Sequence, residues 1–235
     1  MKIIAGNWKM NGSQSALNDM INAIIPVARD VRVMLFVPYT MLRTGADNIY
    51  IGAQNVSKYE SGAHTGEISA AMVRDMGATA TLVGHSEVRD SLRDTNADVA
   101  LRAEQAINNN LTPIICVGET DEELQSGTAI DIIVRAVRES VPHNAKNGDF
   151  IIAYEPRWAI GRGITPSAQE ILNTHKIIRD TLIDMGFDDT PILYGASVNA
   201  QNAREIMRIK NVDGVLVGGA SLKKQDFIPI IESAK

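Results

Sequence analysis

The chain has 235 residues, of which 45% are hydrophobic and 22% are charged, and its formal net charge is −5 at pH 7. This composition is typical of a globular protein, and no apolar run approaches the roughly 18 residues that a membrane span needs. The negative charge argues against broad nucleic-acid binding. One cysteine and four histidines offer neither an internal disulfide nor a zinc-type spacing, so we expect no metal and no cofactor.

The N-terminal apolar stretch is too short for a signal peptide, so we expect a cytoplasmic protein. Eight short apolar runs rich in β-forming residues then recur along the chain and predict eight strands. They cover residues 3–5, 31–37, 49–53, 81–83, 113–117, 150–154, 191–194 and 215–217. Segments with helical periodicity and capping residues lie between them, the clearest at 13–29, 94–108, 121–140, 167–185 and 200–209.

This alternation predicts an α/β protein with a parallel sheet. The chain has about 29 residues for each of the eight strand–helix units, which fits a closed (β/α)8 TIM barrel forming a single domain over residues 1–235. The competing fold is an open, doubly wound sheet. It would more often stop at five or six strands, and no G-x-G-x-x-G follows the first strand to support a dinucleotide site.

In such a barrel, catalytic groups follow the C-terminal ends of several different strands. Polar and glycine residues stand at these positions, namely Asn7, Lys9, His85, Glu155, Ser197, Gly218 and Gly219. Taken singly, each of these residue types more often has a structural role than a functional one. A strand-end carboxylate is usually solvated, a lone histidine usually belongs to the core, and a lone lysine usually lies on the surface. Their occurrence together at the strand ends favours a site instead. Within it, Glu155 ends a continuously apolar strand, where partial desolvation suits a general base.

Five motifs together resemble the triosephosphate isomerase family, and they run through the whole chain in the family's order. They are GNWKMN at 6–11, GHSE at 84–87, AYEP at 153–156, WAIG at 158–161 and VGGASL at 217–222. The resemblance implies an aldose–ketose isomerase that interconverts dihydroxyacetone phosphate and D-glyceraldehyde 3-phosphate through an enediolate, in glycolysis and gluconeogenesis. The implied partner is therefore a small phosphorylated sugar.

The resemblance also implies the catalytic roles. Glu155 would be the general base that moves the proton between the two carbons. In that family a neutral imidazole polarises the substrate carbonyl, and this role would belong to His85. Lys9 would supply fixed positive charge, and Asn7 would donate a hydrogen bond to substrate oxygens. The phosphate would be bound at Ser197, Gly218, Gly219 and Gly163.

A lid that closes over the substrate and excludes water is implied as well. Its residues would be Pro156, Arg157, Trp158, Ala159, Ile160, Gly161, Arg162 and Gly163. The sequence departs from the family pattern here, because Arg157 and Arg162 stand where valine and threonine are usual. Ala196 also replaces a glycine in the loop after the seventh strand. We expect these changes to affect the efficiency of the reaction rather than its chemistry.

The resemblance further implies a homodimer in which the loop at 54–68 inserts into the partner subunit and brings Thr65 beside the partner's Asn–Lys pair. In the family an arginine and a glutamate meet the glutamate of this loop, Glu67, across the interface. Val88 and Asp94 stand at their positions. We therefore expect Glu67 to lack its usual partner, at a cost of about 1 to 3 kcal/mol if it is buried, unless rearranged partners remove that cost.

Two other functions remain open at this stage. A related isomerase acting on a tetrulose phosphate, such as erythrulose phosphate, could keep every catalytic residue and differ in pocket shape. A non-catalytic barrel is the other, because a fold alone does not confer function. Of these two alternatives, the non-catalytic barrel is less favoured, because Asn7, Lys9, His85 and Glu155 are all present. Neither nucleic acid nor a membrane is expected as a partner.

Overall fold

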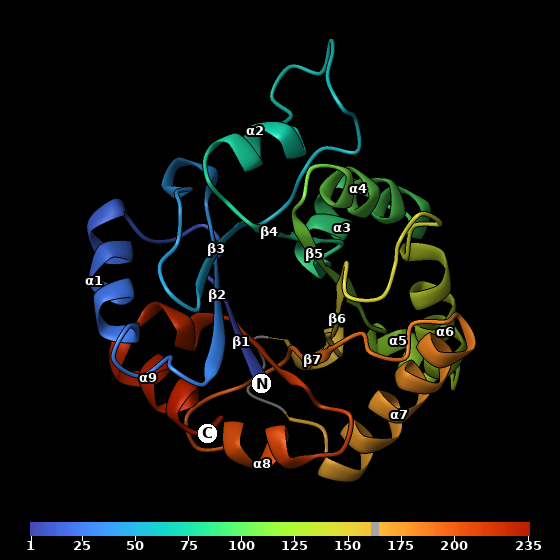
Figure 1. Cartoon of the computed structure of the whole chain (residues 1–235). Coiled ribbons are helices and arrows are strands. Elements are labelled where there is room, and N and C mark those ends of the chain that lie inside the picture. The colour runs from blue at the N-terminus through green and yellow to red at the C-terminus, as the bar shows by residue number, and fades with distance from the viewer. Residues whose placement is uncertain (161–164) are drawn as a thin grey trace.

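The computed structural model describes residues 1–160 and 165–235 and shows a closed barrel of eight parallel strands (Figure 1). Each strand pairs with the next one along the chain, and β8 returns to pair with β1, where Ile4 lies beside Val215. The strands are β1 Lys2–Asn7, β2 Val31–Val37, β3 Ile49–Ala53, β4 Ala80–Val83, β5 Thr112–Val117, β6 Ile151–Tyr154, β7 Ile192–Tyr194 and β8 Gly214–Val217. The predicted (β/α)8 barrel is confirmed.

The strands are apolar along both faces because neither face meets water. One set of side chains, including Phe36, Leu82, Ile114 and Leu193, fills the barrel interior. The alternate residues of the same strands pack outward against the surrounding helices. A parallel sheet buried on both sides produces the continuous apolar runs from which the strands are predicted.

Helices surround the sheet in the order that the alternation predicts. They are α1 Gln14–Ile24, α2 Ala70–Asp75, α3 Ser86–Leu92, α4 Asn96–Asn108, α5 Asp121–Gln125, α6 Ala129–Ser140, α7 Ala168–Asp184, α8 Ala203–Arg208 and α9 Lys224–Glu232. Short 3-10 turns cover Tyr39–Met41, Arg157–Ala159 and Gly219–Leu222. No helix among the described residues combines the length and apolar character needed to cross a membrane.

Two of the predicted helices have different limits in the structure. The helix predicted at 13–29 ends at Ile24, just before Pro26, which has no backbone N–H to continue it. The helix predicted at 121–140 is two helices, α5 and α6. Gly127 lies between them with a φ of 76°, in the left-handed region that terminates a helix.

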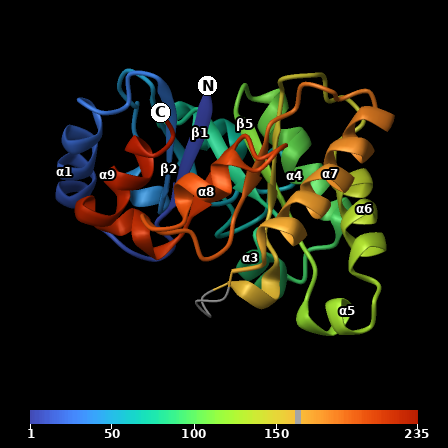
Figure 2. The ribbon, with the colours of Figure 1, turned by 90° about the horizontal axis from the view of Figure 1, so that it is seen from below.

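The polar strand-end residues lie at one end of the barrel. Figure 2 shows α3 and α5 at this end, opposite the N-terminus. This is the end at which the strands finish, and the polar strand-end residues therefore gather there. The loop between β3 and α2 extends away from the barrel (Figure 1). These two features position the site and the candidate partner surface.

A buried histidine on α7 makes the stability of the fold sensitive to acid. His175 is fully buried, and this burial lowers its pKa from 6.5 to about 4, although the carbonyl of Asn211 acts in the opposite direction. The unfolded chain therefore binds a proton that the folded chain excludes between these two pH values. The free energy of unfolding is expected to fall by about 3 kcal/mol through this group as the pH drops from 6.5 to 4.

Urea unfolding across this pH range measures the effect. His175→Gln should show a shallower dependence than the unmodified chain, while the same change at the exposed His143 should leave the dependence as it is. Equal pH slopes for the unmodified chain and His175→Gln would contradict the assignment.

Candidate active site

A cavity of about 250 Å3 opens at the C-terminal ends of the strands and brings together residues that lie on or directly after five of them, β1, β4, β6, β7 and β8. Seven of the residues predicted for the site line it, and these are Asn7, Lys9, His85, Glu155, Ser197, Gly218 and Gly219. Ile160, from the predicted lid, also reaches it. Segments up to 212 residues apart in the sequence thus meet in one place, because all the parallel strands finish at the same rim.

Glu155 lies directly after β6, and its residue is 3% exposed. Its backbone N–H donates to the carbonyl of Val117 at 2.8 Å, which extends the pairing of β6 with β5 by one residue. Its Oε1 is 3.4 Å from Nε2 of His85. The carboxylate is thus held on rigid backbone, shielded from water and aimed at the neighbouring imidazole.

His85 caps the N-terminus of α3, and this position determines where its proton lies. Its Nδ1 accepts a hydrogen bond from the backbone N–H of Glu87 at 3.2 Å. A ring nitrogen that accepts a hydrogen bond carries no proton, so the proton of the neutral ring is on Nε2. That N–H faces Glu155 and the cavity. The ring can therefore donate a hydrogen bond to a substrate oxygen.

Lys9 has a φ of 53°, an uncommon conformation for a residue with a side chain. Two side chains hold it there. Oδ1 of Asn7 accepts a hydrogen bond from the Lys9 N–H at 3.0 Å, and Nε2 of Gln54 donates to its carbonyl at 2.8 Å. The Lys9 ammonium then forms an ion pair with Glu87 at 2.6 Å. Strain of this kind is often found at functional sites, where the surrounding structure maintains it.

The loops after β7 and β8 form the other side of the cavity. Ser197 also has a positive φ, of 43°, and its hydroxyl donates to the carbonyl of Ala159 at 2.9 Å. A β-carbon on Gly218 would lie 3.9 Å from Cε of Lys9, so the lysine stem passes beside this glycine. Space around Gly219 is open. The arrangement leaves room for an anion next to the Lys9 ammonium.

The start of the predicted lid is anchored to the loop after β5. Glu119 is 2% exposed, and its Oε1 accepts hydrogen bonds from Nε1 of Trp158 at 2.7 Å and from the hydroxyl of Tyr154 at 3.1 Å. Burial raises the pKa of Glu119, although these two donors act in the opposite direction. Arg157 forms an ion pair with Asp90 on α3. Gly161, Arg162 and Gly163 lie outside the described residues, so their predicted roles stay predictions.

Thr65 and Glu67 are exposed on the loop that extends away from the barrel, and Thr65 is absent from this chain's own cavity lining. Glu67 lies close to a cation of its own chain. Arg102 of α4 approaches it, with Nη1 3.9 Å from the carboxylate. Arg102 is itself paired with Asp94. The absence of the usual partner of Glu67 across the proposed interface stays a prediction.

Gly195 was not predicted as a site residue, and the structure shows why a glycine is needed there. A β-carbon at this position would lie 2.8 Å from Cγ of Glu155, closer than such atoms approach in proteins. We expect Gly195→Ala to displace the carboxylate and lower kcat by about 10- to 100-fold, with little change in KM, because small misplacements of a reacting group are costly.

Steady-state kinetics test this, with the double variant Gly195→Ala/Glu155→Ala as the control. Because alanine has no Cγ, the contact is absent in the Glu155→Ala background, and Gly195→Ala should cost less there than in the unmodified chain. If the double variant loses kcat by the product of the two single-variant factors, the two residues do not interact and the contact is contradicted.

Comparisons with known proteins agree with this geometry. The family model described as triosephosphate isomerase matches residues 2–234. The triosephosphate isomerase of Vesicomyosocius okutanii is 42% identical, with 99% of this chain and 98% of that protein covered. The enzyme of the same name from Mesorhizobium japonicum is 40% identical over 98% and 95% of the two chains.

The chain belongs to the triosephosphate isomerase family. A solved structure agrees, because the crystal structure of triosephosphate isomerase from Bartonella henselae superposes with a TM-score of 0.91 at 34% identity, covering 99% of this chain and 98% of that one. The resemblance inferred from the five motifs is confirmed, as is the expected fold.

Some residues of this triosephosphate isomerase site carry no sequence signal of their own. Val198 and Leu216 line the cavity, and Gln54 and Glu87 contact Lys9 from other segments. The sequence could have suggested Glu87, since it follows His85 in a motif. Nothing in the sequence relates Gln54 to the carbonyl of Lys9, because Gln54 lies 45 residues from Lys9 along the chain.

Proposed function

We propose that this chain interconverts dihydroxyacetone phosphate and D-glyceraldehyde 3-phosphate by proton transfer through an enediolate. The observation that carries the proposal is the facing pair in the cavity, where the Nε2–H of His85 and the carboxylate of Glu155 are 3.4 Å apart. One group can donate a hydrogen bond to a carbonyl oxygen while the other removes the proton from the adjacent carbon.

Glu155 takes the proton from one carbon and returns it to its neighbour, and the shielded position of this carboxylate supports that role. His85 polarises the carbonyl through Nε2, and the Lys9 ammonium stabilises the negative charge of the enediolate and of the phosphate. Within the described residues, Nδ2 of Asn7 has no hydrogen-bond partner, which leaves it free for a substrate oxygen. The phosphate binds along Ser197, Gly218 and Gly219, with Gly163 joining from the lid.

A coupled assay of glyceraldehyde 3-phosphate against erythrulose phosphates tests the proposal, with Glu155→Asp and His85→Gln as variants. The triose should be turned over faster than the tetrulose, and both variants should lose activity. Turnover of the tetrulose at an equal or higher rate would favour the related isomerase. Full activity in both variants would contradict the mechanism.

The active form is proposed to be a homodimer in which the loop carrying Thr65 completes the partner's site. Exposed apolar side chains support this surface, because Met10 is 95% exposed beside Lys9, and Tyr59 of the loop is 43% exposed. Association through this loop would remove such apolar side chains from water, which is favourable. Sedimentation velocity at assay concentrations should show a dimer, and a fully active monomer would refute it.

The proposed location is the cytoplasm. Cys116, the one cysteine of the sequence, is free and buried, which suits a reducing compartment.

A further inference from the structure

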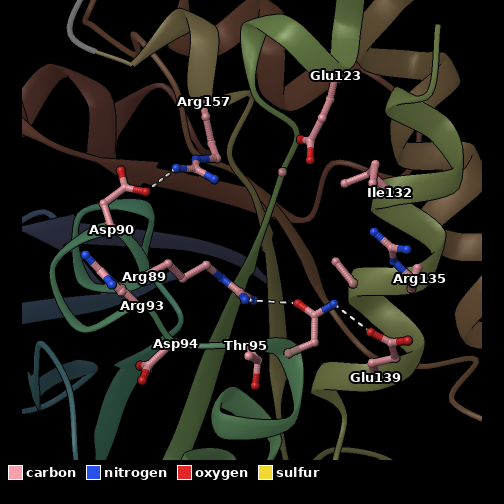
Figure 3. Close-up of a pocket in the computed structure, with 13 residues that line it drawn as sticks. Arg89, Asp90, Arg93, Asp94, Thr95, Glu123, Ile132, Arg135, Glu139 and Arg157 are labelled. Atoms are coloured by element: carbon pink, nitrogen blue, oxygen red, sulfur yellow. Dashed lines mark hydrogen bonds and ion pairs between the residues drawn. The ribbon is translucent and has the colours of Figure 1, made fainter. Parts of the chain in front are cut away.

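A second cavity, of about 480 Å3, lies beside the start of the lid, between α3, α5 and α6 (Figure 3). Among the described residues it shares no lining residue with the catalytic cavity. Its walls carry four arginines, Arg89, Arg93, Arg135 and Arg157. Its volume is in the range of small-molecule sites. The proposed reaction makes no use of it.

Three of these arginines carry a charge that no carboxylate of the described residues neutralises. Arg93 and Arg135 have no carboxylate within ion-pair distance in that part of the chain. Arg89 donates to neutral groups, among them Oδ1 of Asn96 at 2.9 Å and the carbonyl of Cys116 at 3.2 Å. Burial lowers the pKa of Arg89, whose side chain is partly withdrawn from water. Arg89 and Arg93 therefore make the side of the cavity at α3 electropositive.

The acidic residues on the same side of the cavity do not cancel this charge. Asp94 binds Arg102 through two hydrogen bonds, at 2.8 and 3.0 Å, and is neutralised by it. Asp90 pairs with Arg157, but its side chain is 65% exposed. An ion pair in such contact with water is weak. A ligand oxyanion with a higher charge can therefore replace Asp90 as the partner of Arg157.

The opposite wall offers hydrogen-bond acceptors instead. Glu123 accepts from the backbone N–H of Thr120 at 2.8 Å, and Glu139 accepts from Nδ2 of Asn96 at 2.8 Å. Figure 3 shows these two carboxylates on either side of Arg135, across the cavity from Arg93. A carboxylate can accept several hydrogen bonds, so each retains capacity for a hydroxyl group. The cavity thus has Arg89 and Arg93 on one side, and two carboxylate acceptors flanking Arg135 on the other.

We propose that this cavity binds a phosphorylated sugar or polyol, with its phosphate on Arg93 and Arg157 in the field of the Arg89 charge and its hydroxyls on Glu123 and Glu139. Guanidinium groups match the oxygens of a phosphate dianion through paired hydrogen bonds. The described walls contain no aromatic ring on which a base could stack, which disfavours a nucleotide. This site is independent of the proposed catalytic function, since it uses other residues.

Isothermal titration calorimetry with glucose 6-phosphate tests the proposal. The background is Lys9→Met, which removes the cation of the catalytic cavity and so suppresses phosphate binding there. Arg93→Gln should weaken binding by about tenfold through the loss of a charge-assisted contact. Arg204→Gln, the same change at an exposed arginine of α8, should have no effect. Asp90→Asn should tighten binding by a few-fold, because it releases Arg157.

Three results would overturn the proposal. The first is no binding in the Lys9→Met chain up to about 10 mM, beyond the range of a useful site. The second is equal affinity in Arg93→Gln and Arg204→Gln. The third is inorganic phosphate that binds as tightly as glucose 6-phosphate, which would mean an adventitious ion only. None of these three results would change the turnover of the triose phosphates, so none of them would contradict the catalytic proposal.

Discussion

Glu155→Gln is expected to lower kcat by about 10³-fold, because the amide cannot accept the proton that the reaction moves. Glutamine has nearly the same shape, so the packing around this 3% exposed residue should survive. Its amide can also stay near Nε2 of His85, which lies 3.4 Å from the native carboxylate. Binding of the substrate should therefore change much less than turnover. Steady-state kinetics with glyceraldehyde 3-phosphate give kcat and KM separately.

The exchange of the substrate's carbon-bound proton with deuterated solvent provides a second measurement. It should disappear in Glu155→Gln along with turnover, since both need the same base. Glu205→Gln, a matched change at an exposed position on α8, should leave kcat and exchange as they are. More than about a tenth of normal turnover in Glu155→Gln would mean that another group acts as the base.

Arg102→Met is expected to lower the free energy of unfolding by about 3 to 5 kcal/mol, because it leaves a buried charge without its partner. The Arg102 side chain is 4% exposed, and so is that of Asp94, with which it forms two hydrogen bonds. Nη1 of Arg102 also donates to the carbonyl of Val56 at 2.7 Å. The substitution therefore removes the partners of a carboxylate and a carbonyl together.

Urea unfolding measures this loss. The double variant Arg102→Met/Asp94→Leu should recover much of the stability, because an apolar pair needs no charge compensation. Arg208→Met, at an exposed position of α8, serves as the matched control and should change stability by less than about 0.5 kcal/mol. A loss below about 1 kcal/mol in Arg102→Met would show that the network contributes little.

The same variant tests the proposed partner surface. Val56 belongs to the loop that extends from the barrel, and Glu67 of that loop lies 3.9 Å from Arg102. Removal of Arg102 should loosen the loop and lower the fraction of dimer in sedimentation velocity. An unchanged dimer fraction would separate the network's role in stability from any role in association.

The positions of the candidate catalytic residues follow from the sequence to a large extent. Once eight apolar runs predict a barrel, residues after the strand ends must meet at one rim, and Lys9, His85 and Glu155 do so. The helix limits were less accurate. Hydrophobic periodicity continues across Gly127, so the break between α5 and α6 depends on one backbone conformation that the periodicity does not record.

The sequence by itself determined the fold and the residues at the barrel rim, because both depend on local patterns repeated along the chain. The tertiary structure alone decided which atoms of these residues face one another. The proton of His85 is placed by a backbone N–H of α3, and Gly195 is required by the nearness of Glu155. Arg102 of α4 approaches Glu67 of the extended loop, and the arginines of the second cavity come from three separate segments. Contacts of this kind join residues that are distant in sequence, and the folding of the backbone brings them together.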